Sequence, residues 1–312
     1  MSVTVKLLGF LVALAAIFGS AVGLGRVVGP VNSSPAADHG DMGDMQMAES
    51  GATSIPKGLM VSQNGYSFRL DQAIVAPGAA VPVSFTIEDA DGDPVTDYDE
   101  EHEKELHLIA VRRDFSGFQH VHPERAEDGT WSTTLDLTAG QWRLFADFKA
   151  SGAEAITLGN DLAVRGDYQP AAPTADTRTA QVDGYTVTLD GDVASGEEAR
   201  LTLSVTRDGE PVTDLEPYLG AYGHLVALRS GDLAYLHVHP EGTPGDGKTE
   251  SGPDVVFFAE VPSPGSYHLY LDFQHDGVVR TAAFTVTASD SAGSEPTSDD
   301  ESDGEHADDD AH

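Results

Sequence analysis

The sequence predicts an all-β protein, with two tandem immunoglobulin-like Greek-key β-sandwich domains after an N-terminal hydrophobic helix. Three observations predict this fold. Short runs rich in Val, Leu, Thr, Tyr and Phe alternate with clusters of Gly, Pro and Asp, as strands alternate with turns. Beyond the N-terminal stretch, no long segment has an apolar period of 3.6 residues. About seven such runs occur in each of two stretches of about a hundred residues, which is typical of an immunoglobulin-like sandwich.

The predicted strands fall into two matching sets. In the first set they cover residues 66–71, 81–88, 105–112, 118–122, 131–137, 141–148 and 155–164. In the second they cover residues 182–189, 199–206, 222–229, 233–238, 255–261, 266–273 and 278–287.

The second half of the chain repeats the first half. His-Leu recurs at 107–108 and 224–225, and HVHPE recurs at 120–124 and 237–241, both at an offset of 117. Downstream, LTAGQWRLFADF ends at Phe148 and PSPGSYHLYLDF ends at Phe273, an offset of 125, so the second copy has a loop eight residues longer. Co-linear matches over this length predict two copies of one domain.

The chain divides into six segments. They are a signal peptide or membrane anchor (1–30), a flexible His/Met linker (31–56), the first sandwich (57–166), a connector (167–179), the second sandwich (180–287) and a disordered acidic tail (288–312). Lys6 before the uncharged run 7–25 fits a secretory signal, and the run is about as long as the roughly 20 residues that span a bilayer. Either interpretation puts the body of the protein outside the cytoplasm, secreted or anchored.

The charge balance and composition exclude several classes of function. There are 17 basic and 52 acidic residues, a net charge of −35, which repels nucleic acids and favours a salt-adapted, halophilic protein. There is no cysteine, so disulfides and thiolate chemistry are excluded. The sequence has no Gly-x-Ser-x-Gly, His-Glu-x-x-His, P-loop or dinucleotide-binding pattern, and we predict that the protein is not an enzyme.

Six of the twelve histidines stand in repeat register. They are His107, His120 and His122 in the first copy, and His224, His237 and His239 in the second. Residues two apart in a strand point to one face, so each HVH places two imidazoles side by side. If Val111 paired with His120, His107 would lie diagonally to His122, whereas a slip of two residues would place these two histidines directly opposite. In either register three imidazoles can converge.

Neutral imidazole is a good ligand for copper, zinc and nickel, so the two triads are candidate metal sites. Further candidate ligands are Glu124 and Glu241 after each HVHP, His102 near the first triad, and His39, Met42, Met45 and Met47 in the linker. Thioether and imidazole together suit Cu(I). The predicted cofactor is a copper ion, with zinc or another divalent metal as the other choice. The alternative is that the histidines are structural and bond to the backbone at a sheet end.

The segment HLIAVRRDFSGFQHVHP at 107–123 resembles a motif of exported actinobacterial and haloarchaeal proteins, some of them labelled heavy-metal-binding or copper-associated. The resemblance runs from about Gly58 to Gly166 and implies a metal-associated role outside the cytoplasm. The second copy departs from it, with RSGDLAY in place of RRDFSGF.

Together these features predict an extracytoplasmic metal-binding protein that sequesters or delivers copper, with the metal ion and a copper-transport protein as partners. The N-terminal segment, if uncleaved, would attach it to a membrane. The alternative is a non-catalytic surface adhesion or assembly module with structural histidines.

Overall fold

The structure is a computed structural model that describes residues 55–236 and 238–290, and all regular structure in these ranges is β-strand. The described residues belong to one compact unit. The predicted N-terminal helix, the His/Met linker and the acidic tail lie outside the described residues. Within the described ranges, no helix has the length and apolarity needed to cross a membrane.

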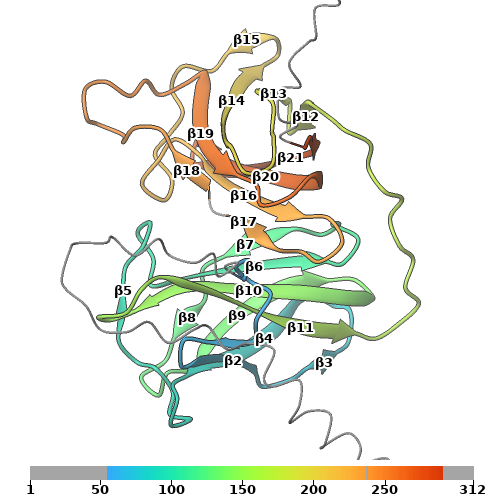
Figure 1. Cartoon of the computed structure of the whole chain (residues 1–312), viewed down its shortest axis with the longest axis vertical. Coiled ribbons are helices and arrows are strands. Elements are labelled where there is room, and N and C mark those ends of the chain that lie inside the picture. Colours follow the sequence, from blue (N-terminus) through green and yellow to red (C-terminus); the bar gives the residue numbers. More distant parts are fainter. Residues whose placement is uncertain (1–54, 237, 291–312) are drawn as a thin grey trace, which may run out of the picture. The chain divides into compact units, whose positions relative to one another are not determined.

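The first copy of the repeat folds into two sheets that pack face to face (Figure 1). Its strands are β1 (Ser62–Gln63), β2 (Tyr66–Leu70), β3 (Ile74–Val75), β4 (Gly78–Glu88), β5 (Tyr98–Asp99), β6 (Leu106–Arg112), β7 (Gln119–Val121), β8 (Glu124–Arg125), β9 (Trp131–Leu137), β10 (Gly140–Ala150) and β11 (Ile156–Val164). One sheet has the order β1-β2-β4-β9-β8, and the other has the order β3-β11-β10-β6-β7, with β5 paired to β10. This order is that of an immunoglobulin-like sandwich.

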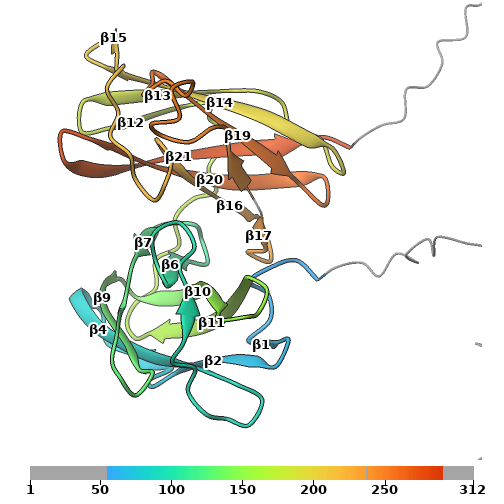
Figure 2. The same ribbon diagram turned by 90° about the vertical axis from the view of Figure 1, so that its left-hand side faces the viewer.

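The second copy has the same arrangement. Its strands are β12 (Thr179–Val182), β13 (Tyr185–Asp190), β14 (Glu198–Arg207), β15 (Glu210–Pro211), β16 (His224–Arg229), β17 (Tyr235–Leu236), β18 (Val238–Pro240), β19 (Asp254–Glu260), β20 (Gly265–His275) and β21 (Val278–Ala288). The sheets run β12-β13-β14-β19-β18, with β15 on β14, and β17-β16-β20-β21. Figure 2 shows β14 beside β19 in one layer and β20 beside β21 in the other. The predicted tandem immunoglobulin-like fold is therefore confirmed.

Strand β6 is the element that explains how the site is positioned. Strand β14 alternates buried residues with more exposed ones, but every residue of β6 is buried. Leu108 and Ala110 face the core of the first sandwich. Ile109 and Val111 face the other way, into an apolar cluster shared with the second sandwich. Because side chains alternate along a strand, His107 lies on this outer face with Ile109 and Val111.

The outer apolar cluster joins the two sandwiches. Its buried members are Ile109, Val111 and Phe145 from the first copy, and Val226, Leu228, Leu233, Tyr235 and Tyr270 from the second. Burial of these side chains stabilises the contact by about 25 cal/mol for each Å² of apolar surface removed from water. The sheet faces that carry His107 and His224 are therefore the ones in contact.

The turn between β6 and β7 needs its glycine. Gly117 has φ of 68°, and a Cβ at this position would lie 2.6 Å from the Trp142 ring. Only glycine meets both conditions without strain. The turn fixes the register in which Ile109 pairs with His120.

Candidate metal centre

Three imidazoles of the first sandwich meet at one ring nitrogen, Nδ1 of His107. Nε2 of His120 lies 3.1 Å from it, and Nε2 of His122 lies 3.2 Å from it. Strand pairing causes this convergence, because continuing the β6–β7 register by one pair beyond Leu108–Val121 places His107 opposite His122. Of the two registers compatible with the sequence, the structure has the directly opposed one.

Hydrogen bonds fix where the ring protons of two of these histidines lie. Nε2 of His107 is 2.9 Å from the carbonyl oxygen of Glu101, which can only accept, so this nitrogen carries the proton. Nδ1 of His120 is 2.8 Å from Oδ2 of Asp272 and donates to that carboxylate. In the neutral rings, the nitrogens that remain bare are Nδ1 of His107 and Nε2 of His120.

Those two bare nitrogens face each other at 3.1 Å. Neither can donate while both rings are neutral, so the contact brings two lone pairs together without a proton between them. A proton or a metal ion would relieve the repulsion. Metal-binding histidines usually donate their other ring N–H to a carbonyl or a carboxylate, which fixes the ring tautomer in this way.

Burial keeps the imidazoles neutral. Burial is the main cause that lowers the pKa of His120 and of His122 to about 3, and repulsion by the like charges of neighbouring histidines acts in the same direction. Burial also lowers the pKa of His107. For Asp272, burial raises the pKa to about 6, and the hydrogen bond from Thr281 opposes that rise. At neutral pH the cluster therefore presents neutral nitrogens beside one carboxylate.

The second sandwich completes the cluster. Ligand atoms of His120, His224 and Asp272 lie within 4.8 Å of one another, as do those of His107, His120 and His122. The ring of His224 is centred 4.8 Å from that of His120, and it is parallel to that of His107 at 5.8 Å. Nδ1 of His224 is buried without a hydrogen-bond partner in the described part of the chain. Burial holds the pKa of His224 well below its usual range.

The chain matches twice the family described as a domain of unknown function, DUF8832, over residues 61–164 and 180–290. The chain belongs to this family. Each match coincides with one sandwich, so each sandwich is one DUF8832 domain. No curated protein matches the chain.

Several solved structures show distant similarity to the tandem DUF8832 domains. They include the Escherichia coli adhesin FdeC (18% identity, TM-score 0.22, 75% of this chain and 66% of that one), the Yersinia pseudotuberculosis adhesin InvE (11%, 0.21, 73% and 59%), and a putative membrane-anchored protein from Corynebacterium diphtheriae (11%, 0.22, 73% and 59%). The chain thus spans less than two thirds of the length of each. Similarity at this level carries no argument about function.

The second triad was predicted to combine His224 with His237 and His239. His237 lies outside the described residues, and within them the structure groups His224 with His120 and Asp272. Val238 already pairs with Ala259 of the opposite sheet, whereas its counterpart Val121 still pairs with Leu108. His239 therefore does not lie opposite His224.

The other predicted ligands have separate positions. The ring of His102 is centred 6.2 Å from that of His107 and 6.0 Å from that of His224. Glu124 is exposed and pairs in β8 with the opposite sheet, away from the β6–β7 hairpin. Glu241 forms an exposed ion pair with Arg200. Outside the described residues lie His237, His39, Met42, Met45 and Met47.

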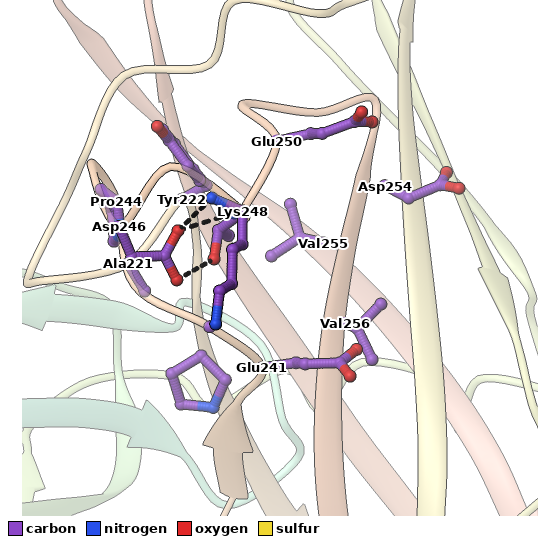
Figure 3. A pocket seen from close by; sticks show the side chains of 13 residues that line it. Ala221, Tyr222, Glu241, Pro244, Asp246, Lys248, Glu250, Asp254, Val255 and Val256 are labelled. Carbon is purple, nitrogen blue, oxygen red and sulfur yellow. Dashed lines mark hydrogen bonds between the residues drawn. The ribbon is translucent and has the colours of Figure 1, made fainter.

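Figure 3 shows Glu241 on the wall of a pocket in the second DUF8832 domain, with Asp246 and Lys248 on the long loop that this domain has gained. The carboxylate of Asp246 accepts hydrogen bonds from the backbone of Lys248 and Thr249 within that loop. No histidine lines this pocket. Glu241 is thus separate from the histidine cluster, contrary to the prediction.

Asp272 is the residue of the candidate site that the sequence-based prediction missed. It stands opposite His224 in the β16–β20 ladder, and its counterpart Asp147 stands opposite His107. The signal was present in the repeat, since an Asp precedes the Phe in both LFADF and LYLDF. What the sequence does not show is that this carboxylate serves a histidine of the other domain.

Proposed function

We propose that this protein binds a transition-metal ion, copper, through His107, His120 and His122. In this proposal, Asp272 of the second domain orients His120, and the ring of His224 packs against the ring of His120. The observation that carries the proposal is the pair of bare nitrogens on His107 and His120, 3.1 Å apart, with both ring protons held elsewhere.

The spacing of the nitrogens supports this proposal. A tetrahedral centre with metal–nitrogen bonds of about 2.0–2.1 Å has ligand nitrogens about 3.3–3.4 Å apart. The contacts of 3.1 and 3.2 Å at Nδ1 of His107 need only small ring movements to reach that spacing. An all-imidazole set with a nearby carboxylate suits copper or zinc better than magnesium or calcium, which prefer oxygen ligands.

A binding role, either sequestration or delivery, fits this site better than catalysis. The centre is closed, since the side chain of His120 is only 1% exposed and that of Asp272 3% exposed. In this proposal the protein acts outside the cytoplasm, carried there by its N-terminal segment. The His/Met linker would supply Cu(I) ligands near the body, and a copper-transport protein would be the partner.

A second candidate function is a non-catalytic surface adhesion or assembly module whose histidines are structural. One observation favours it: His107 and His120 each bond a group that a structural histidine could use, a backbone carbonyl and a buried carboxylate. If the histidines are only structural, nothing explains why Nδ1 of His107 and Nε2 of His120, neither of which carries a proton, lie 3.1 Å apart.

Calorimetric titration of the full chain with Cu²⁺, Cu⁺ and Zn²⁺ separates the two candidates. Two variants are compared with the wild type: a triple change of His107, His120 and His122 to alanine, and a linker change of His39, Met42, Met45 and Met47 to serine. The proposal predicts saturable binding that the linker variant retains and the triple variant loses. Binding that survives the triple change would contradict it.

Stability of the metal-free protein is expected to fall in acid. The pKa of His120 and His122 is about 3 in the fold and about 6.5 in the unfolded chain, so protonation favours unfolding as the pH falls from about 6.5 towards 3. Asp272 opposes this, because its pKa is raised to about 6 and its protonation favours the fold below that pH. The destabilisation by the two histidines exceeds the stabilisation by Asp272, so the free energy of unfolding falls by about 2 kcal/mol between pH 7 and pH 5.

Urea unfolding at a series of pH values, with a chelator present, measures this loss. The variant without the three histidines should have a flatter profile over the same range. A wild-type profile that is equally flat would mean that the imidazoles are solvated and not buried as the structure has them.

A further inference from the structure

Residues that are equivalent in the repeat form the two sides of the contact between the domains. Ile109 and Val226 are equivalent in the repeat, and both lie in the shared apolar cluster. So do Val111 and Leu228, which are likewise separated by 117 positions. A surface that contacts its own equivalent implies a local two-fold relation, as in an isologous dimer.

Aromatic contacts follow the same relation. Phe118 of the first domain stacks on Tyr270 of the second, with ring centroids 3.9 Å apart. Their repeat equivalents, Tyr235 and Phe145, also contact each other across the interface, with centroids 5.7 Å apart. The interface therefore consists of two related halves.

The histidine cluster occupies only one of these halves. His107 and His224 are themselves equivalent, and their rings are parallel within 7° at 5.8 Å, as expected beside a two-fold axis. The first half combines His107 and the HVH pair of the first domain with Asp272 of the second. The two-fold relation maps His107, His122 and Asp272 onto His224, His239 and Asp147, whereas the equivalent of His120 is His237, which lies outside the described residues.

We infer that this opposite half is a second metal-binding position, formed by His224, His239 and Asp147, for a divalent ion such as Cu²⁺ or Zn²⁺. The inference rests on the proposed function of the first half. One cavity of about 250 Å³ is lined by all three of these residues together with His102, His107 and Glu101.

The carboxylate in this half is held in the same way as its equivalent. Oδ1 of Asp147 accepts a hydrogen bond from Thr157, as Oδ1 of Asp272 does from Thr281. The second oxygen of Asp272 holds His120. The second oxygen of Asp147 has no hydrogen bond or ion pair within the described residues and is available to a cation. Nδ1 of His224, buried and without a partner there, is the other unsatisfied ligand atom.

The second position is more open than the first. His239 is exposed in β18, which pairs with β19 of the opposite sheet, and the exposed His102 borders the same cavity. The ligand atoms of His224, His239 and Asp147 are not among the groups that lie within 4.8 Å of one another, so a metal ion must draw them together. We expect weaker and faster-exchanging binding here than at His107, His120 and His122.

Titration with Zn²⁺ and with Cu²⁺ tests this inference, in a full-length background that carries the linker change to serine. The starting protein should bind two equivalents, one tight and one at least tenfold weaker. His239→Ala and Asp147→Asn should each remove the weak equivalent and leave the tight one. His120→Ala should weaken the tight equivalent more than the weak one, and Glu241→Gln should change neither.

Electron paramagnetic resonance of the Cu²⁺-loaded protein gives an independent readout. Two distinct copper signals are expected, and His239→Ala should remove only the one that appears at the second equivalent. A single equivalent in the starting protein, or two that survive both His239→Ala and Asp147→Asn, would overturn the second position and leave the first intact. If His120→Ala left the affinity of the tight equivalent unchanged, that result would instead contradict the proposed function.

Discussion

Replacing His120 with alanine is expected to lower metal affinity by more than about 100-fold. A change in a group that only orients a ligand lowers metal affinity about 10–100-fold, and His120 is itself a proposed ligand. Its Nε2 faces Nδ1 of His107 at 3.1 Å, and its ring is buried, so no water can easily take its place. Calorimetry or chelator competition measures the change.

Two matched variants make this test specific. Asp272→Asn keeps the shape of the side chain but removes the charge that holds Nδ1 of His120, and a loss of about 10–100-fold is expected. Glu241→Gln removes a carboxylate that pairs with Arg200 outside the cluster, and it should leave affinity unchanged. Equal affinities for wild type, His120→Ala and Asp272→Asn would show that the cluster does not bind metal.

Replacing Val226 with aspartate is expected to separate the two domains and to remove the metal centre with them. Val226 is fully buried in the apolar interface cluster with Ile109 and Val111. An unpaired carboxylate there costs about 3 kcal/mol or more. His224 and Asp272 come from the same sheet as Val226, so they would leave the histidines of the first domain when the interface opens.

The matched control for this prediction is Val279→Asp. Val279 lies in β21 and is 40% exposed, so a carboxylate there remains solvated. Urea unfolding and metal titration of both variants measure the effect. A Val226→Asp protein with wild-type metal affinity would mean that the first domain alone forms the site, and that the contribution of the second domain is incidental.

Much of the fold follows from local patterns. The alternation of apolar residues, the turn clusters and the repeat predict the main strands of both domains within a few residues, because each strand has one face in its own core. The short strands β1, β3, β5 and β8 were not predicted, since two residues carry no period. The complete burial of β6 depends on a second domain that covers its outer face, and no local pattern encodes that partner.

The candidate site was only half predictable. Residues two apart in a strand must share a face, so the convergence of His107, His120 and His122 could be expected from spacing alone. The recruitment of His224 and Asp272 could not, because it depends on how two sheets meet. The pairing of β18 with β19, which takes His239 out of register with His224, could not be predicted either, because the HVHPE segments of both copies are identical in sequence.

The central claim is most directly tested by X-ray absorption spectroscopy of the protein loaded with one equivalent of copper or zinc, in the background without linker ligands. We predict a first shell of nitrogen or oxygen at about 2.0–2.1 Å. At least three imidazoles should appear in the outer-shell scattering, and at least one should be lost in His120→Ala. A first shell of oxygen alone, or a spectrum that His120→Ala leaves unchanged, would contradict the assignment of this cluster as a metal centre.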